Sequence, residues 1–234
     1  MTDIREYLAR KPLLFDGGMG TYYKAAPGAD CEMANLTDPE GVKKVHAEYL
    51  AAGAQAIKTN TFGLPRMAAA QMPGWEELAE AGWKLACDAA AEKDAAVFAD
   101  LGPAPDTEAA PASSAYGLVA QQFAALGAKN FLFETLSSDV GIVEAVKALR
   151  VAVPDAFVMV SFAVLPDGYT REGLLFRDLL RRMEQSGVVD AVGLNCVSAP
   201  GAMKKLVQSL GETLLPLSVM PNAGYPVVTR ARVL

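Results

Sequence analysis

The fold is indicated by Tyr49-Leu-Ala-Ala-Gly-Ala-Gln-Ala-Ile-Lys-Thr-Asn60, where a helical pattern stops at glycine and a short apolar strand ends at a polar residue. The same order recurs in Phe123-Ala-Ala-Leu-Gly-Ala-Lys-Asn-Phe-Leu-Phe-Glu134. It recurs again, with one extra residue, from Gly187 to Asn195-Cys196. A repeated unit of this kind is typical of parallel strands alternating with helices, as in α/β barrels. Such barrels carry their chemistry at the carboxyl ends of the strands, so the polar residues there are candidate site residues.

Seven short apolar runs, most of them followed by a helical pattern, are predicted to be parallel strands covered by helices. They are 13–15, 56–59, 96–99, 131–133, 157–162, 191–194 and 215–219. A (β/α)8 barrel needs an eighth unit, so we expect a TIM-type α/β barrel, truncated or incomplete after the seventh strand. The length fits a single domain over residues 1–234. One helix start is also predicted, at the capping box Thr37-Asp-Pro-Glu40.

Composition excludes several classes of function. The chain has 21 Lys and Arg against 27 Asp and Glu, without the basic footprint of a nucleic-acid-binding protein. It has no apolar run near the roughly 20 residues of a membrane span, and its amino terminus lacks a signal-peptide pattern. We therefore expect a cytoplasmic protein without membrane or nucleic-acid partners. Three cysteines at wide spacings argue against disulfides, and the single His46 rules out a multi-histidine metal site within the chain.

Polar residues stand at the ends of the predicted strands. They are Asp16, Thr59, Asn60, Asp100, Glu134, Ser161, Asn195, Cys196 and Asn222. Carboxylates suit an ammonium group, amides suit a carboxylate, and a thiol is either a nucleophile or a soft metal ligand. The set therefore favours a site for a small zwitterion. For Asp100 a catalytic role and a turn-forming role both stay open, and His46 is expected to pack from a helix face against a strand.

Seven motifs in order along the chain resemble the homocysteine S-methyltransferase family. They are Asp16-Gly-Gly-Met-Gly-Thr21, Asn35-Leu-Thr-Asp-Pro-Glu40, Ala52-Gly-Ala54, Thr59-Asn-Thr-Phe-Gly63, Phe133-Glu-Thr135, Gly193-Leu-Asn-Cys196 and Pro221-Asn-Ala-Gly224. The family includes the homocysteine-binding module of cobalamin-dependent methionine synthase and the betaine and S-methylmethionine enzymes. The resemblance implies a zinc-dependent transfer of a methyl group to the thiol of homocysteine, giving methionine, inside a (β/α)8 barrel.

The resemblance also implies roles by position. Cys196 would be a zinc ligand, and Asn222 would line the site and reach the metal when substrate is absent. Asp16 and Glu134 would hold the substrate ammonium group, and with Cys196 they are the expected catalytic residues. The residues expected to orient the amino acid, besides Asp16 and Glu134, are Gly17, Gly18, Thr59, Asn60 and Asn195.

The chain departs from the family at the metal site. The other two zinc ligands of the family are adjacent cysteines in a Gly-Gly-Cys-Cys-Gly run, which this chain does not contain. Cys31 and Cys87 are expected to be structural or incidental. Two alternatives stay open: a non-catalytic amino-acid-binding module without a complete zinc site, and a barrel enzyme with Cys196 as covalent nucleophile. Methylcobalamin or methyltetrahydrofolate would act through fused or partner domains carboxyl-terminal to this chain; betaine and S-methylmethionine are the other candidate donors.

Overall fold

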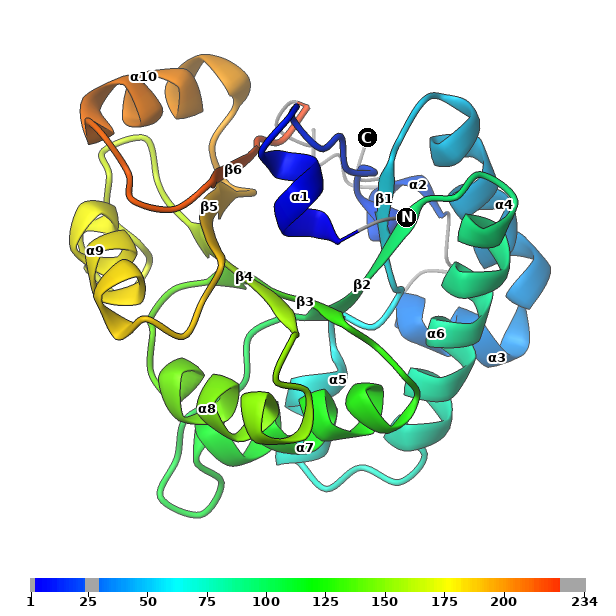
Figure 1. Cartoon of the computed structure of the whole chain (residues 1–234). Helices are drawn as coiled ribbons and strands as arrows, with labels where there is room; N and C mark the ends of the chain where they lie inside the picture. The colour runs from blue at the N-terminus through cyan, green and yellow to red at the C-terminus, as the bar shows by residue number, and fades with distance from the viewer. Residues whose placement is uncertain (1–2, 24–29, 224–234) are drawn as a thin grey trace, which may run out of the picture.

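A computed structural model of the chain describes residues 3–23 and 30–223. Within them, six parallel strands form one sheet in chain order. Figure 1 shows this sheet curving around an interior, with most helices on its outer side. The expected TIM-type α/β barrel is thus confirmed as a six-stranded partial barrel. The strands are β1 (Ala56–Lys58), β2 (Ala96–Leu101), β3 (Asn130–Leu136), β4 (Phe157–Ala163), β5 (Ala191–Asn195) and β6 (Leu217–Met220).

The first of the seven predicted strands is reduced to a single bridge. Phe15 pairs in parallel with Ala56. The Leu14 carbonyl accepts the N–H groups of Gln55 and Ala56, and the Asp16 N–H donates to the Ala56 carbonyl at 3.0 Å. The segment therefore follows the outer edge of β1 without an extended ladder, and it still brings Asp16 alongside this strand.

The helices connect the strands and cover the outside of the sheet. None within the two described stretches combines the length and apolar character needed to span a membrane. The longer helices are α4 (Pro39–Ala51), α6 (Trp75–Ala91), α7 (Ala112–Ala125), α8 (Ile142–Ala152), α9 (Phe176–Ser186) and α10 (Pro200–Leu210). The shorter ones are α1 (Ile4–Leu8), α2 (Met19–Tyr22), η1 (Cys31–Met33), α3 (Ala34–Thr37) and α5 (Leu64–Ala69).

The start of α4 differs from the predicted capping box. Its cap is Asp38, whose carboxylate accepts the Gly41 N–H at 3.2 Å. Thr37 belongs to α3 and donates its hydroxyl to the Met33 carbonyl at 3.0 Å. The physical reason is Pro39, because proline favours the first helical position and so makes the preceding residue the cap.

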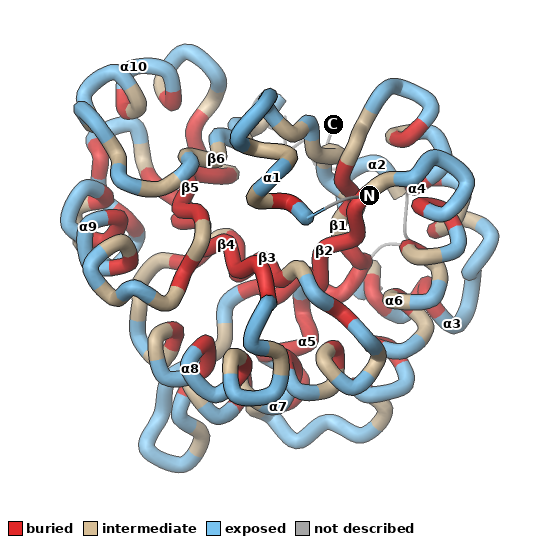
Figure 2. The backbone as a smooth tube through the Cα atoms, viewed as in Figure 1, coloured by how far each residue is buried: buried red, intermediate tan, exposed pale blue. Residues whose placement is uncertain are grey.

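Alternate strand residues face opposite sides of the sheet, as the pleat requires. Figure 2 shows buried positions along the strands and on the helix faces turned toward them. On the inner side, apolar residues form a cluster that Ile4 and Leu8 of α1 join, and Figure 1 shows α1 lying across the interior. We call it the inner apolar cluster; its buried strand residues are Ala56, Ala96, Phe98, Leu132, Phe157, Met159 and Ala191.

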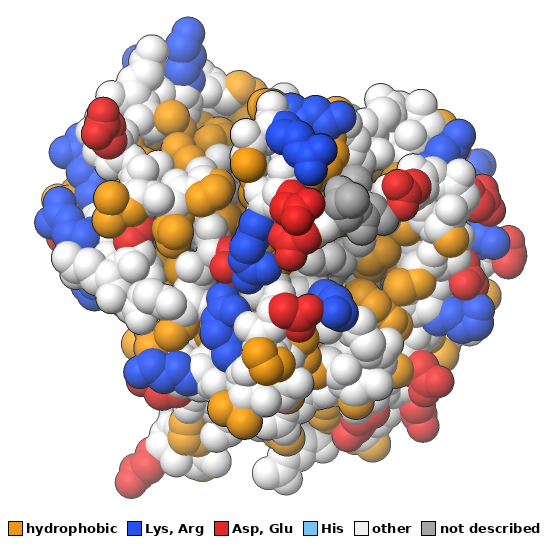
Figure 3. All heavy atoms as spheres, viewed as in Figure 1, with side chains coloured by type: hydrophobic (Ala, Val, Ile, Leu, Met, Phe, Trp, Pro, Cys, Tyr) orange, Lys and Arg blue, Asp and Glu red, His pale blue; other side chains and the backbone are white. Residues whose placement is uncertain are grey.

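Helix α1 is tied to the base of the barrel, where the strands begin, through Asp190. The carboxylate of Asp190 accepts hydrogen bonds from Arg5 Nη2 at 2.7 Å, from Arg150 Nη2 at 2.8 Å and from the Val158 N–H at 2.7 Å. Arg5 also donates to the Ala156 carbonyl at 2.6 Å. Figure 3 shows side chains of both charge signs interspersed around the centre of this face. The predicted site residues stand at the opposite ends of the strands.

Candidate active site at the carboxyl ends of the strands

Two carboxylates and one ammonium group meet inside the barrel. Lys58 Nζ lies 3.5 Å from Asp16 Oδ1 and 3.8 Å from Glu134 Oε2. The other Asp16 oxygen accepts the backbone N–H of Lys58 at 3.0 Å. Lys58 follows Ala56 by two residues and Glu134 follows Leu132 by two, so both continue the inner face of the sheet. The structure thus brings together the predicted pair Asp16 and Glu134 and adds Lys58 between them.

Asp100 belongs to the same inner layer, because it follows the inward-facing Phe98 by two residues in β2. Its side chain is buried, and its Oδ1 has no hydrogen-bond partner among the described residues. Its backbone N–H donates to Thr59 Oγ1 at 3.0 Å, and its carbonyl accepts the Thr61 hydroxyl at 2.9 Å. Asp100 therefore stands within a strand and not in a turn, so the turn-forming role is wrong, and a catalytic role stays a prediction.

Burial and charge shift the pKa values of this cluster. Burial raises the pKa of Asp16 to about 6, although the Lys58 ammonium opposes the shift. Burial also raises the pKa of Asp100 well above its ordinary value, and Glu134 adds to the effect. Burial by itself would lower the pKa of Lys58, but Glu134, Asp16 and Asp100 outweigh it and raise this pKa. At neutral pH, Lys58 is therefore a cation and Asp16 is mostly ionised.

Cys196 follows β5 directly, at a point where the backbone is strained. The φ angles of Thr135, Cys196 and Val197 are +60°, +56° and +54°. Positive φ is uncommon outside glycine, especially for β-branched residues, and such strain clusters at functional sites. Asn195 holds this arrangement: its Oδ1 accepts the Thr135 N–H at 3.0 Å, and its Nδ2 donates to Thr135 Oγ1 at 2.8 Å. β3 also shifts its register against β4 here.

Two side chains point donors at the Cys196 sulfur. Thr135 Oγ1 lies 3.6 Å from it and Asn195 Nδ2 lies 3.3 Å from it. Burial raises the pKa of the Cys196 thiol, and the hydrogen bond from Thr135 works in the opposite direction. The charges of Glu134 and Lys58 also act on this thiol, with opposite signs. The sulfur is thus half-buried, held in place and electrostatically linked to the charged cluster.

Thr59 and Asn60 use their side chains within the protein. The hydroxyls of Thr59 and Thr61 lie 2.6 Å apart. Asn60 Nδ2 donates to the Cys31 carbonyl at 2.9 Å and to Asn35 Oδ1 at 3.0 Å, and Asn35 Nδ2 donates back to the Asn60 carbonyl at 2.8 Å. These bonds fix the loop after β1, and a direct role of Thr59 and Asn60 in orienting substrate stays a prediction.

The glycines after the first predicted strand allow a close approach. A Cβ at Gly17 would lie 2.6 Å from Tyr49 Oη, and this hydroxyl donates to the Gly18 carbonyl at 3.2 Å. Residue 17 must therefore lack a side chain for Tyr49 to pack there. Asn222, just after β6, donates its backbone N–H to the Ser198 carbonyl at 3.1 Å. This bond places Asn222 against the loop that begins at Cys196.

Lys58 is the member of the cluster that a comparison of strand ends misses, because it lies two residues before the polar end of its strand. The alternation of side chains would have found it. Lys58 shares a face with Ala56, and that face is buried in a barrel. A lysine on such a face needs carboxylate partners, which is a signal for Asp16 and Glu134.

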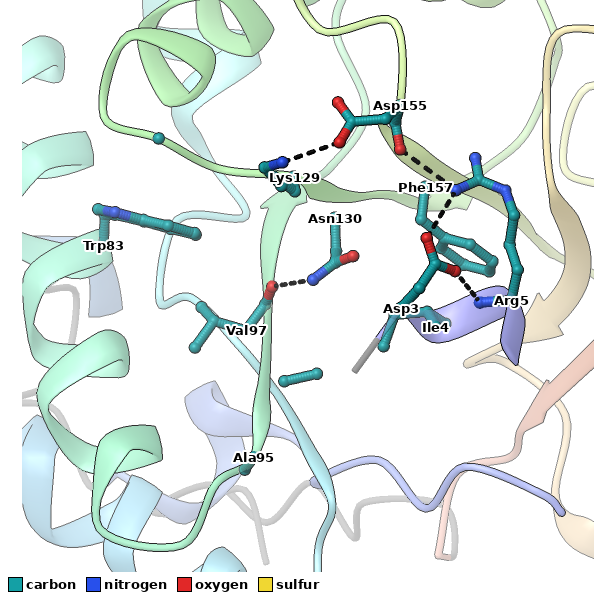
Figure 4. Close-up of a pocket in the computed structure, with 12 residues that line it drawn as sticks. Asp3, Ile4, Arg5, Trp83, Ala95, Val97, Lys129, Asn130, Asp155 and Phe157 are labelled. Carbon is teal, nitrogen blue, oxygen red and sulfur yellow. Dashed lines mark hydrogen bonds and ion pairs between the residues drawn. The ribbon is translucent and has the colours of Figure 1, made fainter. Parts of the chain in front are cut away.

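A cavity of about 370 Å³ lies at the base of the barrel between α1 and the first residues of the strands. Figure 4 shows its polar side chains paired with neighbouring groups. Lys129 Nζ donates to Asp155 Oδ2 at 2.8 Å, Arg5 donates to the Asp155 carbonyl at 3.2 Å, and Asn130 donates to the Val97 carbonyl at 3.1 Å. Since these polar groups already form hydrogen bonds within the protein, we place the candidate active site at the strand ends instead.

The described residues contain no group of three or more His, Cys, Asp and Glu side chains placed to hold a metal ion. Cys31, on η1, and Cys87, on α6, are free thiols, and burial raises the pKa of both. His46 is fully buried on α4, and neither ring nitrogen has a hydrogen-bond partner among the described residues. Cys196 is thus the thiol that interacts with the charged cluster, whereas Cys31 lies beside Asn60, and no histidine stands beside Cys196.

Comparisons of the sequence with a family model and with individual proteins identify the same family. The family model for homocysteine S-methyltransferase matches residues 13–232. The chain is 30% identical to methionine synthase of Mycobacterium tuberculosis over 97% of its own length, but it spans only 21% of that protein. Its coverage of the methionine synthase of Mycobacterium leprae is the same. Homocysteine S-methyltransferase of Escherichia coli K12 is 25% identical, over 93% of this chain and 80% of that protein.

Solved structures share the fold. The crystal structure of the homocysteine methyltransferase MmuM from Escherichia coli, in its metallated form, aligns with a TM-score of 0.77 at 23% identity. The alignment covers 95% of this chain and 88% of that one. The apo form aligns with a TM-score of 0.72 at 26% identity. Because the family model covers nearly the whole sequence, the resemblance of the motifs is confirmed: the chain belongs to the homocysteine S-methyltransferase family.

Proposed function

We propose that residues 1–234 form the homocysteine-binding domain of an enzyme that transfers a methyl group to the homocysteine thiol, giving methionine. The observation that carries the proposal is the juxtaposition of the Asp16, Lys58 and Glu134 cluster with the Cys196 thiol, whose pKa responds to Glu134 and Lys58. The names of the relatives, methionine synthase and homocysteine S-methyltransferase, support it. The names describe those proteins.

The cluster is suited to binding an amino acid. The carboxylates of Asp16 and Glu134 offer negative charge to an ammonium group, and the inner apolar cluster beneath them limits screening by water. Bound there, the amino acid would direct its side-chain thiol toward Cys196. Thr135 and Asn195 fix the position of the Cys196 sulfur before substrate arrives. Positioning of this kind lowers the entropic cost of bringing reacting groups together.

Zinc dependence is a further part of the proposal for the complete enzyme. Cys196 would supply one thiolate ligand near Asn222, and a bound zinc would supply activation of the homocysteine thiol. The described residues do not fit a zinc ion on their own, because they contain no group of three or more His, Cys, Asp and Glu side chains placed to bind one. Elemental analysis decides the point: about one zinc per chain requires ligands beyond the described residues, and none leaves a homocysteine pocket without metal.

The methyl donor and the cellular setting are also proposals. Because the chain spans 21% of the mycobacterial methionine synthases, methylcobalamin or methyltetrahydrofolate supplied through fused or partner domains is favoured. We propose the cytoplasm as the location. The three cysteines are free thiols, as expected for a protein of a reducing compartment.

Calorimetric titration with L-homocysteine tests the binding half of the proposal. The wild-type chain is expected to bind it, and Glu134→Gln is expected to weaken binding by about tenfold or more, since the negative charge that strengthens the hydrogen bond to the ammonium group is lost. Glu144→Gln, which changes an exposed carboxylate on α8, is the matched control and should bind as wild type does. Absence of binding by the wild type, or unchanged binding by Glu134→Gln, would contradict the proposal.

Methionine formation from homocysteine and each candidate donor tests the transfer half. Any donor that yields methionine at a rate above the protein-free reaction supports the enzyme. Binding of homocysteine without methionine from any donor supports the second candidate, a non-catalytic amino-acid-binding module. The lack of a three-ligand metal group among the described residues is the observation that favours this alternative.

A further inference from the structure

Lys58 is an unusual residue to find in this layer. Its side chain is only 13% exposed and reaches the inside of the barrel at the level of Asp16 and Glu134. Other lysines and arginines with partly buried side chains, such as Arg5 and Arg150, are bound to Asp190 at the base. Among the described residues, Lys58 is the one cation that joins the charged cluster.

The ion pairs of Lys58 leave its hydrogen-bond donors free for a ligand. Its distances to Asp16 and Glu134 are 3.5 and 3.8 Å, longer than the roughly 2.7–3.2 Å of a direct hydrogen bond. Asp16 Oδ1, Asp100 Oδ1 and Ser161 Oγ are buried on the inner side without hydrogen-bond partners among the described residues. Buried polar atoms usually have hydrogen-bond partners, so several atoms without hydrogen bonds in one layer point to a polar ligand there.

The charges of the layer match both ends of an amino acid. Carboxyl groups come from Asp16, Asp100 and Glu134, and they suit an ammonium group. A zwitterion also brings a carboxylate, and burying that group without a cationic partner is costly. Lys58 is the group in the cluster that can offer a positive charge. In the bound state, the ammonium group of the ligand would lie next to the carboxyl groups, and its carboxylate would lie next to Lys58.

We propose that Lys58 is a specificity-determining residue that binds the carboxylate of the amino-acid substrate, while the neighbouring carboxyl groups bind its ammonium group. The inference rests on the proposed function, because it takes homocysteine as the substrate. It adds that the site selects thiols carrying a free carboxylate. A lysine that served only as a permanent counter-ion for Asp16 and Glu134 would give no such selection.

A comparison of two ligands tests the proposal by binding alone. L-Homocysteinamide keeps the thiol and the amine but replaces the carboxylate with a neutral amide. The wild-type chain should bind L-homocysteine about 10- to 100-fold more tightly than this amide, as expected for a charge-assisted hydrogen bond. In Lys58→Met the two ligands should bind with nearly equal dissociation constants, because the group that distinguishes them is gone. Lys58→Arg should restore most of the preference.

Controls keep the outcomes separate. Lys84→Met removes an exposed lysine on α6 that pairs with Asp88, and it should leave the preference unchanged. Equal binding of both ligands by the wild type overturns the role of Lys58 even when Lys58→Met does not fold. A preference that persists in a folded Lys58→Met also overturns it and leaves the proposed function standing. Failure of the wild type to bind homocysteine at all overturns both.

Discussion

The hydroxyl of Thr135, in β3, lies 3.6 Å from the sulfur of Cys196, at the end of β5, and both residues adopt left-handed backbone conformations. Two strands that flank β4 thus carry strained residues at their carboxyl ends, and these residues face each other. The strain is held by the two hydrogen bonds between Asn195 and Thr135. A cost in backbone energy is tolerated here because it fixes one sulfur atom at the strand ends.

Removal of the Thr135 hydroxyl should therefore make the Cys196 thiol less reactive. Thr135→Val keeps the shape of the side chain but removes a donor to the sulfur, so the thiolate form is less stabilised. We expect alkylation of Cys196 by iodoacetamide at pH 8 to slow about three- to tenfold. Mass spectrometry of the peptide distinguishes it from Cys31 and Cys87. Thr135→Ser, which keeps the hydroxyl, is the control, and equal rates in all three proteins would argue against the hydrogen bond.

The pKa of Asp16 predicts how its contribution to stability changes with pH. Folding raises this pKa from 3.8 to about 6, so the folded protein binds the extra proton between these values. The contribution of Asp16 to the free energy of unfolding then falls as pH rises from about 4 to 6, by about 3 kcal/mol at most. Asp16→Asn lacks this titration. Denaturant unfolding at several pH values should show the variant gaining on the wild type across this window, and parallel curves would refute the assignment.

His46 should give the opposite trend. Burial lowers its pKa from 6.5 to about 4, so in this interval the unfolded chain binds a proton that the folded protein does not. The wild type should lose stability as pH falls through this range, by about 3 kcal/mol relative to a variant without the imidazole. His46→Leu is such a variant. The difference in unfolding free energy between the two proteins should be flat above pH 7 and grow steadily below pH 6.5.

Gly17→Ala should destabilise the protein through Tyr49. The new Cβ would lie 2.6 Å from Tyr49 Oη, so the ring must move and its bond to the Gly18 carbonyl is lost. We expect a cost of about 1–3 kcal/mol in thermal or denaturant unfolding. Gly20→Ala in α2 is the matched control, because its Cβ would meet no atom within 4 Å. The cost of Gly17→Ala should largely disappear in a Tyr49→Ala background, which removes the obstructing ring.

The sequence predicts the sheet well because buried parallel strands are encoded locally, as apolar runs between helical patterns. Six of the seven predicted runs became strands of the sheet. The run at 13–15 did not extend its pairing beyond one bridge, and Leu14 is 58% exposed. The hydrophobicity of a segment does not show over how many residues it will pair with a neighbouring strand. That quantity depends on where the preceding and following segments lie in three dimensions.

The site was predictable only in part, for a related reason. Polar residues at strand ends, such as Glu134 and Cys196, stand out in the sequence. The ion pair between Lys58 and Glu134 does not, because it joins β1 to β3 across the interior with β2 between them. Likewise the burial of Asp100 follows from the curvature of the sheet and from the neighbours it brings. Polar residues after apolar runs identify the ends of strands in the sequence. The curvature of the sheet decides which of their side chains meet.

The position of α1 bears on how the protein can be handled in the laboratory. This helix lies at the base, and Asp3 and Arg5 line the cavity there, away from the strand ends. A dye, an affinity label or a surface linker joined ahead of Asp3 would therefore leave from the face opposite the candidate site. Attachment near Asn222 would instead crowd the loop that begins at Cys196. The amino end is the better point for immobilising this protein in binding measurements.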